Sequence, residues 1–210
     1  MSIFKFLVNH NKQGSFVNQF RQKRFDYLKN RIEKLIKKDP FKILDIGGDI
    51  QYWKNIGWQH PACKIHLLNL YTSEIPQSDV NKFSSSVGNG LALEYKKGDV
   101  DLIFSNSVIE HVGSYENQQI FANEVMRVSD KYIIQTPSLW FPLEPHSLLP
   151  LFQFLPHPIR ALLIMTFNIN YFPKAKTYKA AIIVSHSTLM FTHNRFKQLF
   201  PDAEIQVERF

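Results

Sequence analysis

The stretch FKILDIGGD at residues 41–49 decides how this chain is expected to fold. Its first part, Phe41–Ile46, is mostly apolar and follows Pro40, which predicts a short buried strand. Gly47 and Gly48 follow at once, and a glycine lets the backbone approach a ligand where a side chain would collide. The stretch therefore predicts a buried strand followed by a turn that either binds a ligand or only connects the strand to a helix.

Beyond this stretch, short apolar segments alternate with helical patterns. The further predicted strands are Lys64–Leu68, Phe83–Val87, Val100–Ser105, Lys131–Thr136 and Glu204–Phe210. The predicted helices are Gln51–Gly57, Leu91–Lys96, Tyr115–Val128 and Phe191–Phe200. Strands that alternate with helices are typical of a parallel sheet covered on both faces. We therefore expect an α/β fold with a Rossmann-like, doubly wound and mostly parallel sheet, which binds its ligand at the carboxyl ends of the strands.

An amphipathic helix is predicted ahead of the first strand, at residues 15–38, with Ser15 as its N-cap. Its apolar side chains recur at three- and four-residue spacing: Phe16, Phe20, Tyr27, Leu28, Ile32, Leu35 and Ile36. Residues 1–40 carry ten Lys and Arg against three acids, so the net charge of +7 lies here. This helix is either a solvated basic face or a surface for an acidic substrate or an anionic membrane. Charge confined to one element does not favour a nucleic-acid interface.

The composition excludes several other classes of protein. Hydrophobic residues make up 44% of the chain and charged residues 20%, which excludes wholesale disorder. The single cysteine, Cys63, excludes a disulfide framework and a thiolate-rich zinc site, and no other metal-ligand spacing is apparent, so no metal site is expected. No signal peptide is predicted, because only a few apolar residues precede the polar residues that begin at His10. No membrane span is predicted, because prolines interrupt the most apolar run, Leu148–Ile169.

A second informative stretch is DLIFSNSVIEHV at residues 101–112, where a buried strand runs into a polar turn and then a helix. Together with Lys42–Gly48 it resembles the class I S-adenosylmethionine-dependent methyltransferases of the small Methyltransferase-11 type. The resemblance covers residues 41–136, and the run SNSVIEHV is its most specific match. The run WFPLEPH at residues 140–146 is similar to bacterial members of this type whose genes often lie among cell-envelope glycan functions.

The resemblance implies that S-adenosylmethionine is the cofactor. The residues that it places at the cofactor are Asp45, Gly47, Gly48, Asn69, Leu70, Gly88, Asn89, Ser105 and Asn106. Asn69 stands where the family has the acid that holds the ribose hydroxyls, and Asn89 where it has the acid that contacts the adenine amino group. An amide forms such bonds without charge assistance, which about halves their strength. The usual Gly-x-Gly is replaced by Gly-Gly-Asp at residues 47–49, and a sixth strand but no seventh is visible.

Methyl transfer from a sulfonium needs a nucleophile held in line with the methyl group, and a hydroxyl or amine nucleophile also needs a base. The candidate catalytic residues are His146, Glu144 and His111. Glu144 and His146 lie in a predicted helical insertion, whereas His111 begins the helix after the fourth strand. The alternative for His111 is a structural role in which it packs and bonds to the backbone. Glu110 is assigned to helix N-terminal electrostatics.

We expect one domain with four parts: a basic cap at 1–40, a cofactor-binding core at 41–136, a substrate-covering insertion at 137–190, and a C-terminal helix and strand at 191–210. The interpretation is an enzyme that transfers a methyl group from S-adenosylmethionine to a hydroxyl or amine of a small-molecule, glycan or lipid-linked acceptor. We expect a cytoplasmic protein without a nucleic-acid partner, in peripheral contact with the inner face of the membrane.

Two alternative functions remain open. A non-catalytic methyltransferase-like binding or partner subunit, with a degenerate cofactor pocket, would explain the amides at Asn69 and Asn89. A dinucleotide-dependent oxidoreductase is disfavoured, because Gly-x-Gly-x-x-Gly is absent and no acid ends the second predicted strand.

Overall fold

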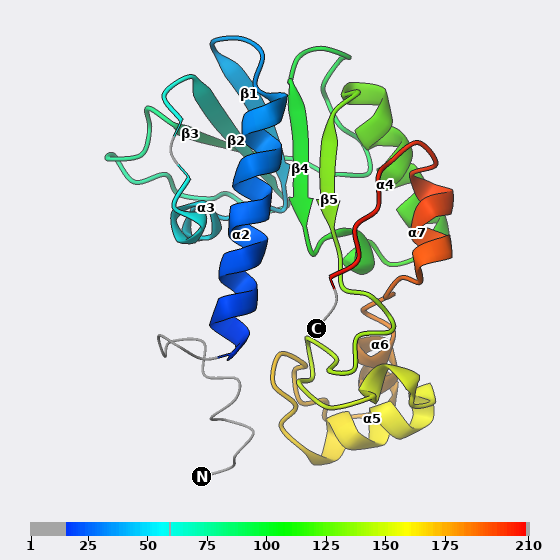
Figure 1. Ribbon diagram of the computed structural model, residues 1–210. Coiled ribbons are helices and arrows are strands. Elements are labelled where there is room, and N and C mark those ends of the chain that lie inside the picture. Colours follow the sequence, from blue (N-terminus) through cyan, green and yellow to red (C-terminus); the bar gives the residue numbers. More distant parts are fainter. Residues whose placement is uncertain (1–15, 59, 209–210) are drawn as a thin grey trace.

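The computed structural model describes residues 16–58 and 60–208, and its centre is a five-stranded sheet (Figure 1). The strands are β1 (Phe41–Ile46), β2 (Cys63–Asn69), β3 (Phe83–Val87), β4 (Leu102–Asn106) and β5 (Tyr132–Gln135). Their order is β3-β2-β1-β4-β5, and every neighbouring pair is parallel. The first five predicted strands are confirmed, with ends that shift by no more than two residues. The strand order reverses between β1 and β4, which is where such sheets bind ligands.

Helices cover both faces of the sheet. One face carries α2 (Phe16–Leu35) and α3 (Ile50–Ile56), and the other carries α4 (Tyr115–Val128) and α7 (His193–Leu199) (Figure 1). Strand β1 serves both layers, because Ile43 belongs to the apolar cluster with α2 and α3, whereas Leu44 belongs to the cluster with α4 and α7. A strand buried on both faces reads as a nearly continuous apolar run, as the sequence of β1 does.

The N-terminal helix is confirmed, but its buried face differs in part from the predicted one. Phe25, Leu28 and Ile32 are buried, whereas Tyr27 is 37% exposed. Phe25 shares one helix face with Leu28 and Ile32 through three- and four-residue spacing, and Tyr27 lies beside that face. Three predicted features lie outside the described residues, namely the N-cap Ser15 and the side chains of Phe16 and Phe20.

Two other predicted elements are not found. The predicted helix Leu91–Lys96 is wrong, because the backbone N–H of Leu93 donates to the Glu124 side chain at 2.7 Å instead of to a helical carbonyl. The predicted strand Glu204–Phe210 is wrong over its described residues, 204–208, which are irregular. Ion pairs of Glu204 and Glu208 with arginines of α2 hold this segment against the helix, away from any strand partner.

Residues 137–190 form a small lobe beyond the carboxyl ends of β4 and β5 (Figure 1). Its helices α5 (His157–Thr166) and α6 (Tyr178–Ser185) pack around a separate apolar core, which confirms a helical insertion. Large apolar side chains remain exposed on this lobe: Trp140, Leu151, Phe154, Leu162, Phe167 and Tyr171. Among the helices in the described part of the chain, none is both long and apolar enough to cross a membrane.

Candidate functional site

A cavity of about 220 Å³ opens at the carboxyl ends of β1 and β4, where the strand order reverses. Its lining residues are Asp45, Gly47, Gly48, Asp49, Tyr52, Phe104 and Asn106. Four of the residues predicted to bind a cofactor therefore line this cavity, namely Asp45, Gly47, Gly48 and Asn106. The sequence reasoning missed Asp49 and Tyr52. Asp49 is the N-cap of α3, and an acid directly after a glycine turn and before a helix is a signal that could have found it.

Asp45 is the buried acid of this pocket, with only 1% of its surface exposed. Its Oδ2 accepts a hydrogen bond from the indole nitrogen of Trp53 at 2.6 Å, whereas its Oδ1 has no partner among the described residues. Burial raises the pKa of Asp45 to about 8, although the bond from Trp53 opposes the rise. A buried carboxyl group with a free oxygen on a pocket wall can accept a hydrogen bond from a bound ligand.

The two glycines of the turn after β1 are required by the protein's own packing. Gly47 has a φ of 74°, and a Cβ atom there would lie 2.3 Å from Val108 Cγ2. A Cβ atom on Gly48 would lie 2.0 Å from Asp45 Oδ2. Both positions must stay without a side chain so that the turn can pack beneath the loop after β4 and beside Asp45.

Tyr52 of α3 connects the pocket to the surrounding elements. Its hydroxyl group donates to Gln135 Oε1 at 2.9 Å, at the end of β5. Burial raises the pKa of Tyr52, so the hydroxyl group stays protonated at neutral pH. The ring of Phe25 packs edge-on against Tyr52 with centroids 5.8 Å apart, and the adjacent Arg24 forms two hydrogen bonds of 2.6 Å with Glu208. Helix α2 therefore packs against the wall of the pocket, and the C-terminal segment is bound to α2 through Glu208.

Asn69 ends β2, next to the glycine turn. Its amide nitrogen donates to Gly48 O at 2.9 Å and to Ser73 Oγ at 3.0 Å. The side chain therefore holds the turn and the loop after β2 in place. Because both hydrogen bonds use the amide nitrogen, only the side-chain carbonyl oxygen of Asn69 remains to contact a ribose.

The other predicted cofactor residues are absent from the pocket lining. Ser105 is fully buried and donates to Ile46 O at 2.9 Å, so its hydroxyl group joins β4 to β1 instead of facing a ligand. The side-chain oxygen of Asn89 accepts from the backbone N–H two residues further on, at 2.9 Å. Leu70 is 65% exposed, and Gly88 follows β3 where a Cβ atom would meet a leucine of β2. A resemblance to a family motif does not reveal these local contacts.

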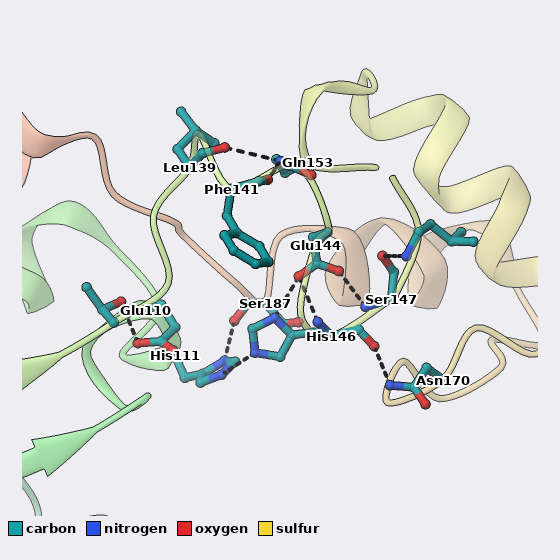
Figure 2. Close-up of polar contacts among 12 residues, drawn as sticks. Glu110, His111, Leu139, Phe141, Glu144, His146, Ser147, Gln153, Asn170 and Ser187 are labelled. Carbon is teal, nitrogen blue, oxygen red and sulfur yellow. Dashed lines mark hydrogen bonds and ion pairs between the residues drawn. The ribbon is translucent and has the colours of Figure 1, made fainter. Parts of the chain in front are cut away.

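The three predicted catalytic residues lie together where the lobe meets the core, as Figure 2 shows. His111 belongs to the 3-10 turn η1 (Ile109–His111) after β4, and Glu144 and His146 come from the lobe. The Nε2 atoms of the two histidines are 3.1 Å apart, across 35 positions of sequence. On the far side of each ring, His146 Nδ1 lies 2.7 Å from Glu144 Oε1, and His111 Nδ1 lies 3.2 Å from Ser187 O.

Glu144 is buried, and its carboxylate accepts hydrogen bonds from the backbone N–H groups of His146 and Ser147 as well as from the His146 ring. Burial acts to raise the pKa of Glu144, but the hydrogen bonds from His146 and Ser147 outweigh it and bring the pKa below its ordinary value. Glu144 is therefore an ionised acceptor that orients the His146 ring.

Glu110 is fully buried beside this cluster and lies in the first turn of η1, the position of the predicted helix-end charge. Its Oε2 accepts from Thr136 Oγ1 at 2.9 Å, and its Oε1 has no partner among the described residues. Burial raises the pKa of Glu110, against the opposing influence of its hydrogen bonds and of the two imidazoles. A carboxylate oxygen of Glu110 and one nitrogen each of His111 and His146 lie within 4.8 Å of one another. The spacing in the sequence does not reveal this potential metal-ligand group, because its members come from two distant segments.

No family model and no curated protein matches this chain. In structure it is similar to phosphoethanolamine N-methyltransferase 2 of Haemonchus contortus in complex with S-adenosyl-L-methionine, at 13% identity and a TM-score of 0.49, over 93% of this chain and 39% of that one. It is also similar to a SAM-dependent methyltransferase of Methanosarcina mazei, at 16% identity and a TM-score of 0.37, over 48% of this chain and 52% of that one. The chain spans about half the length of several solved structures that it matches.

Proposed function

We propose that this chain is an S-adenosylmethionine-dependent methyltransferase that binds its cofactor in the pocket at the carboxyl ends of β1 and β4. The observation that carries the proposal is that Asp45, whose Oδ1 has no partner among the described residues, is one of the residues that line that pocket. S-adenosylmethionine is positively charged at its sulfonium and ammonium groups, and the ammonium group donates hydrogen bonds. A buried carboxylate gains most from a donor that also carries positive charge.

The position and the lining residues of the pocket support the same assignment. The reversal of strand order at β1 and β4 is the general ligand site of open parallel sheets. The residues that would hold the cofactor there are Asp45, Gly47, Gly48, Tyr52 and Asn106. When bound, the cofactor supplies an activated methyl group, so the protein has to orient an acceptor and exclude water, and orientation alone is worth about 7–11 kcal/mol.

We place the acceptor on the side of the lobe, in contact with His146, His111 and Glu144. The Nε2 atoms of the two imidazoles lie 3.1 Å apart, beside the position that we assign to the acceptor. The acceptor group is a hydroxyl or an amine of a small molecule, a glycan or a lipid-linked compound. The exposed rings of Trp140 and Phe154, with centroids 5.7 Å apart, support an acceptor that has an apolar part.

The basic helix α2 supports an anionic partner less strongly than its sequence suggests. Arg24 and Arg31 form ion pairs with Glu208 and Glu204, so part of their charge is neutralised within the fold. Peripheral contact with the inner face of a membrane, in a cytoplasmic protein, would therefore depend on the exposed apolar side chains of the lobe.

Calorimetric titration with S-adenosylmethionine and S-adenosylhomocysteine tests the proposal. The wild-type protein should bind both, and Asp45→Asn should weaken the binding of S-adenosylmethionine, because it keeps an acceptor for Trp53 but removes the carboxylate. Asp130→Asn is the matched control, since Asp130 is an exposed acid that pairs with Lys97. Folded wild-type protein that binds neither compound would overturn the proposal and leave the non-catalytic subunit as the explanation.

A further inference from the structure

The two histidines at the junction of lobe and core face each other through their Nε2 atoms. His146 Nδ1 lies 2.7 Å from a carboxylate oxygen of Glu144, and His111 Nδ1 lies 3.2 Å from the carbonyl oxygen of Ser187 (Figure 2). An ionised carboxylate and a backbone carbonyl only accept hydrogen bonds, so each Nδ1 carries a proton. In a neutral imidazole, Nε2 then presents a lone pair.

Two lone pairs therefore meet at the 3.1 Å separation of the Nε2 atoms. The arrangement requires a positive charge between or beside them, which is either an extra proton on one ring or a metal ion. A proton shared by the two rings would still leave the buried Oε1 of Glu110 without a partner. A metal ion would bind both lone pairs and attract the carboxylate of Glu110, since one oxygen of that group lies within 4.8 Å of both nitrogens.

The separation of the two nitrogens agrees with coordination to one ion. Two imidazole nitrogens at about 2.05 Å from a common ion are about 2.9 Å apart at a right angle and about 3.3 Å apart at a tetrahedral angle. The observed 3.1 Å lies between these values. The outer contacts have the usual form for histidine ligands, whose second ring nitrogen donates to a carboxylate or a backbone carbonyl.

We propose that Glu110, His111 and His146 bind a divalent transition-metal ion such as Zn²⁺, with Glu144 as the positioning residue for His146. Two imidazoles and one carboxylate suit Zn²⁺ and its first-row neighbours better than Mg²⁺ or Ca²⁺, which prefer oxygen ligands. Three protein ligands leave a coordination position open for water or another oxygen ligand.

The ion would also fasten the lobe to the core. Glu110 and His111 follow β4, whereas His146 belongs to the lobe. A bound ion would therefore add a connection between two segments that the bond from Leu189 N to Glu110 O, at 2.8 Å, already joins. A ligand that binds only the folded state raises the melting temperature. The inference is independent of methyl transfer and does not rest on the cofactor assignment.

Metal binding by the purified, chelator-treated full chain tests the inference without any cofactor. Titration with Zn²⁺ and with Co²⁺ should give one ion per chain, a visible Co²⁺ absorption spectrum that Zn²⁺ abolishes, and a higher melting temperature. Mg²⁺ should produce none of these effects. His146→Ala should abolish the spectrum, and Glu144→Gln should weaken binding by about 10- to 100-fold through the loss of ring orientation.

His193→Ala is the matched control, because His193 is an exposed histidine at the start of α7, and it should bind the ion like the wild type. Wild-type protein that binds no Zn²⁺ or Co²⁺, or a folded His146→Ala variant that binds as tightly as the wild type, would overturn the inference. Circular dichroism of each metal-free variant shows whether it is folded, and Glu144→Gln remains as a second test if His146→Ala is not. Protein that binds Zn²⁺ but no S-adenosylmethionine would contradict only the proposed function.

Discussion

The indole nitrogen of Trp53 donates a hydrogen bond of 2.6 Å to Asp45 Oδ2, which joins the end of β1 to α3 beneath the pocket. This bond satisfies one carboxylate oxygen and leaves Oδ1 without a partner among the described residues. A carboxyl group buried in this way is disfavoured in its charged form. The protonation of Asp45 should therefore affect both the stability of the fold and the affinity of the pocket.

The contribution of Asp45 to the free energy of unfolding should decrease as the pH rises from about 4 to about 8. The pKa of Asp45 is about 8 in the folded chain, and about 3.9 is usual for an unfolded chain. Between these values the folded state keeps a proton that the unfolded state has lost, so the stabilisation is complete below the lower pKa and is lost as the pH passes the upper one. Asp45→Asn cannot ionise and should remove at least about 1 kcal/mol of this decrease in urea unfolding. If the free energy of unfolding changes equally with pH in the wild type and in Asp45→Asn, the raised pKa of Asp45 is contradicted.

S-adenosylmethionine should bind more tightly as the pH rises toward about 8, because a cation beside Asp45 favours its ionised form. Binding near neutral pH should release a proton, which calorimetry in two buffers of different ionisation enthalpy measures. Asp45→Asn should bind without that release. If the wild-type heat of binding is the same in both buffers, Asp45 does not face the cationic group.

Gly47→Ala should destabilise the fold more than Gly57→Ala. Both glycines have positive φ, 74° and 64°, so both substitutions strain the backbone by a similar amount. Only at Gly47 would the new Cβ collide, 2.3 Å from Val108, whereas nothing lies within 4 Å at Gly57. We expect a cost of about 1 kcal/mol at Gly57 and a further 1–3 kcal/mol, roughly, at Gly47, measured by urea unfolding. Equal costs would show that the turn can move away from Val108.

Asn69→Asp should weaken both the fold and cofactor binding, although a carboxylate at this position would match the family pattern. The amide nitrogen of Asn69 donates to Gly48 O, and an aspartate would place an acceptor against that carbonyl. The loss should be about 1–3 kcal/mol in stability. Asn89→Asp is the control, because Asn89 uses its oxygen as an acceptor, which aspartate retains. Tighter cofactor binding by Asn69→Asp would show that the side chain reorients toward the ribose.

Contact with anionic vesicles, if the lobe mediates it, should persist at high salt. Exposed charges are screened over about 8 Å at physiological ionic strength, whereas apolar contacts are not screened. Replacing the exposed Trp140 and Phe154 by alanine should reduce flotation with the vesicles, and Arg24→Ala should change it little because Arg24 pairs with Glu208. Flotation that high salt abolishes would instead assign the contact to the basic helix.

The sequence by itself determined the strands and the main helices of the core. Phe41–Ile46 and Phe83–Val87 have the observed bounds, and Tyr115–Val128 begins and ends as predicted. These elements depend on local properties, namely an apolar run of strand length or a three- and four-residue apolar repeat. The predicted helix Phe191–Phe200 is found as α7, His193–Leu199, and its N-cap is Thr192, which accepts a hydrogen bond from Arg195 N at 3.2 Å.

Only the tertiary structure decided which polar groups are left for a ligand. Asn69 and Ser105 have residue types that suit a cofactor, but their donors are used by Gly48 O and Ile46 O. His111 and His146 are 35 positions apart, so no spacing rule could place their nitrogens 3.1 Å from each other. Such groups meet through the packing of the lobe against the carboxyl end of the sheet. The type of a residue determines which hydrogen bonds it can form. Its neighbours in the folded chain determine which of its groups are still free to bind a ligand.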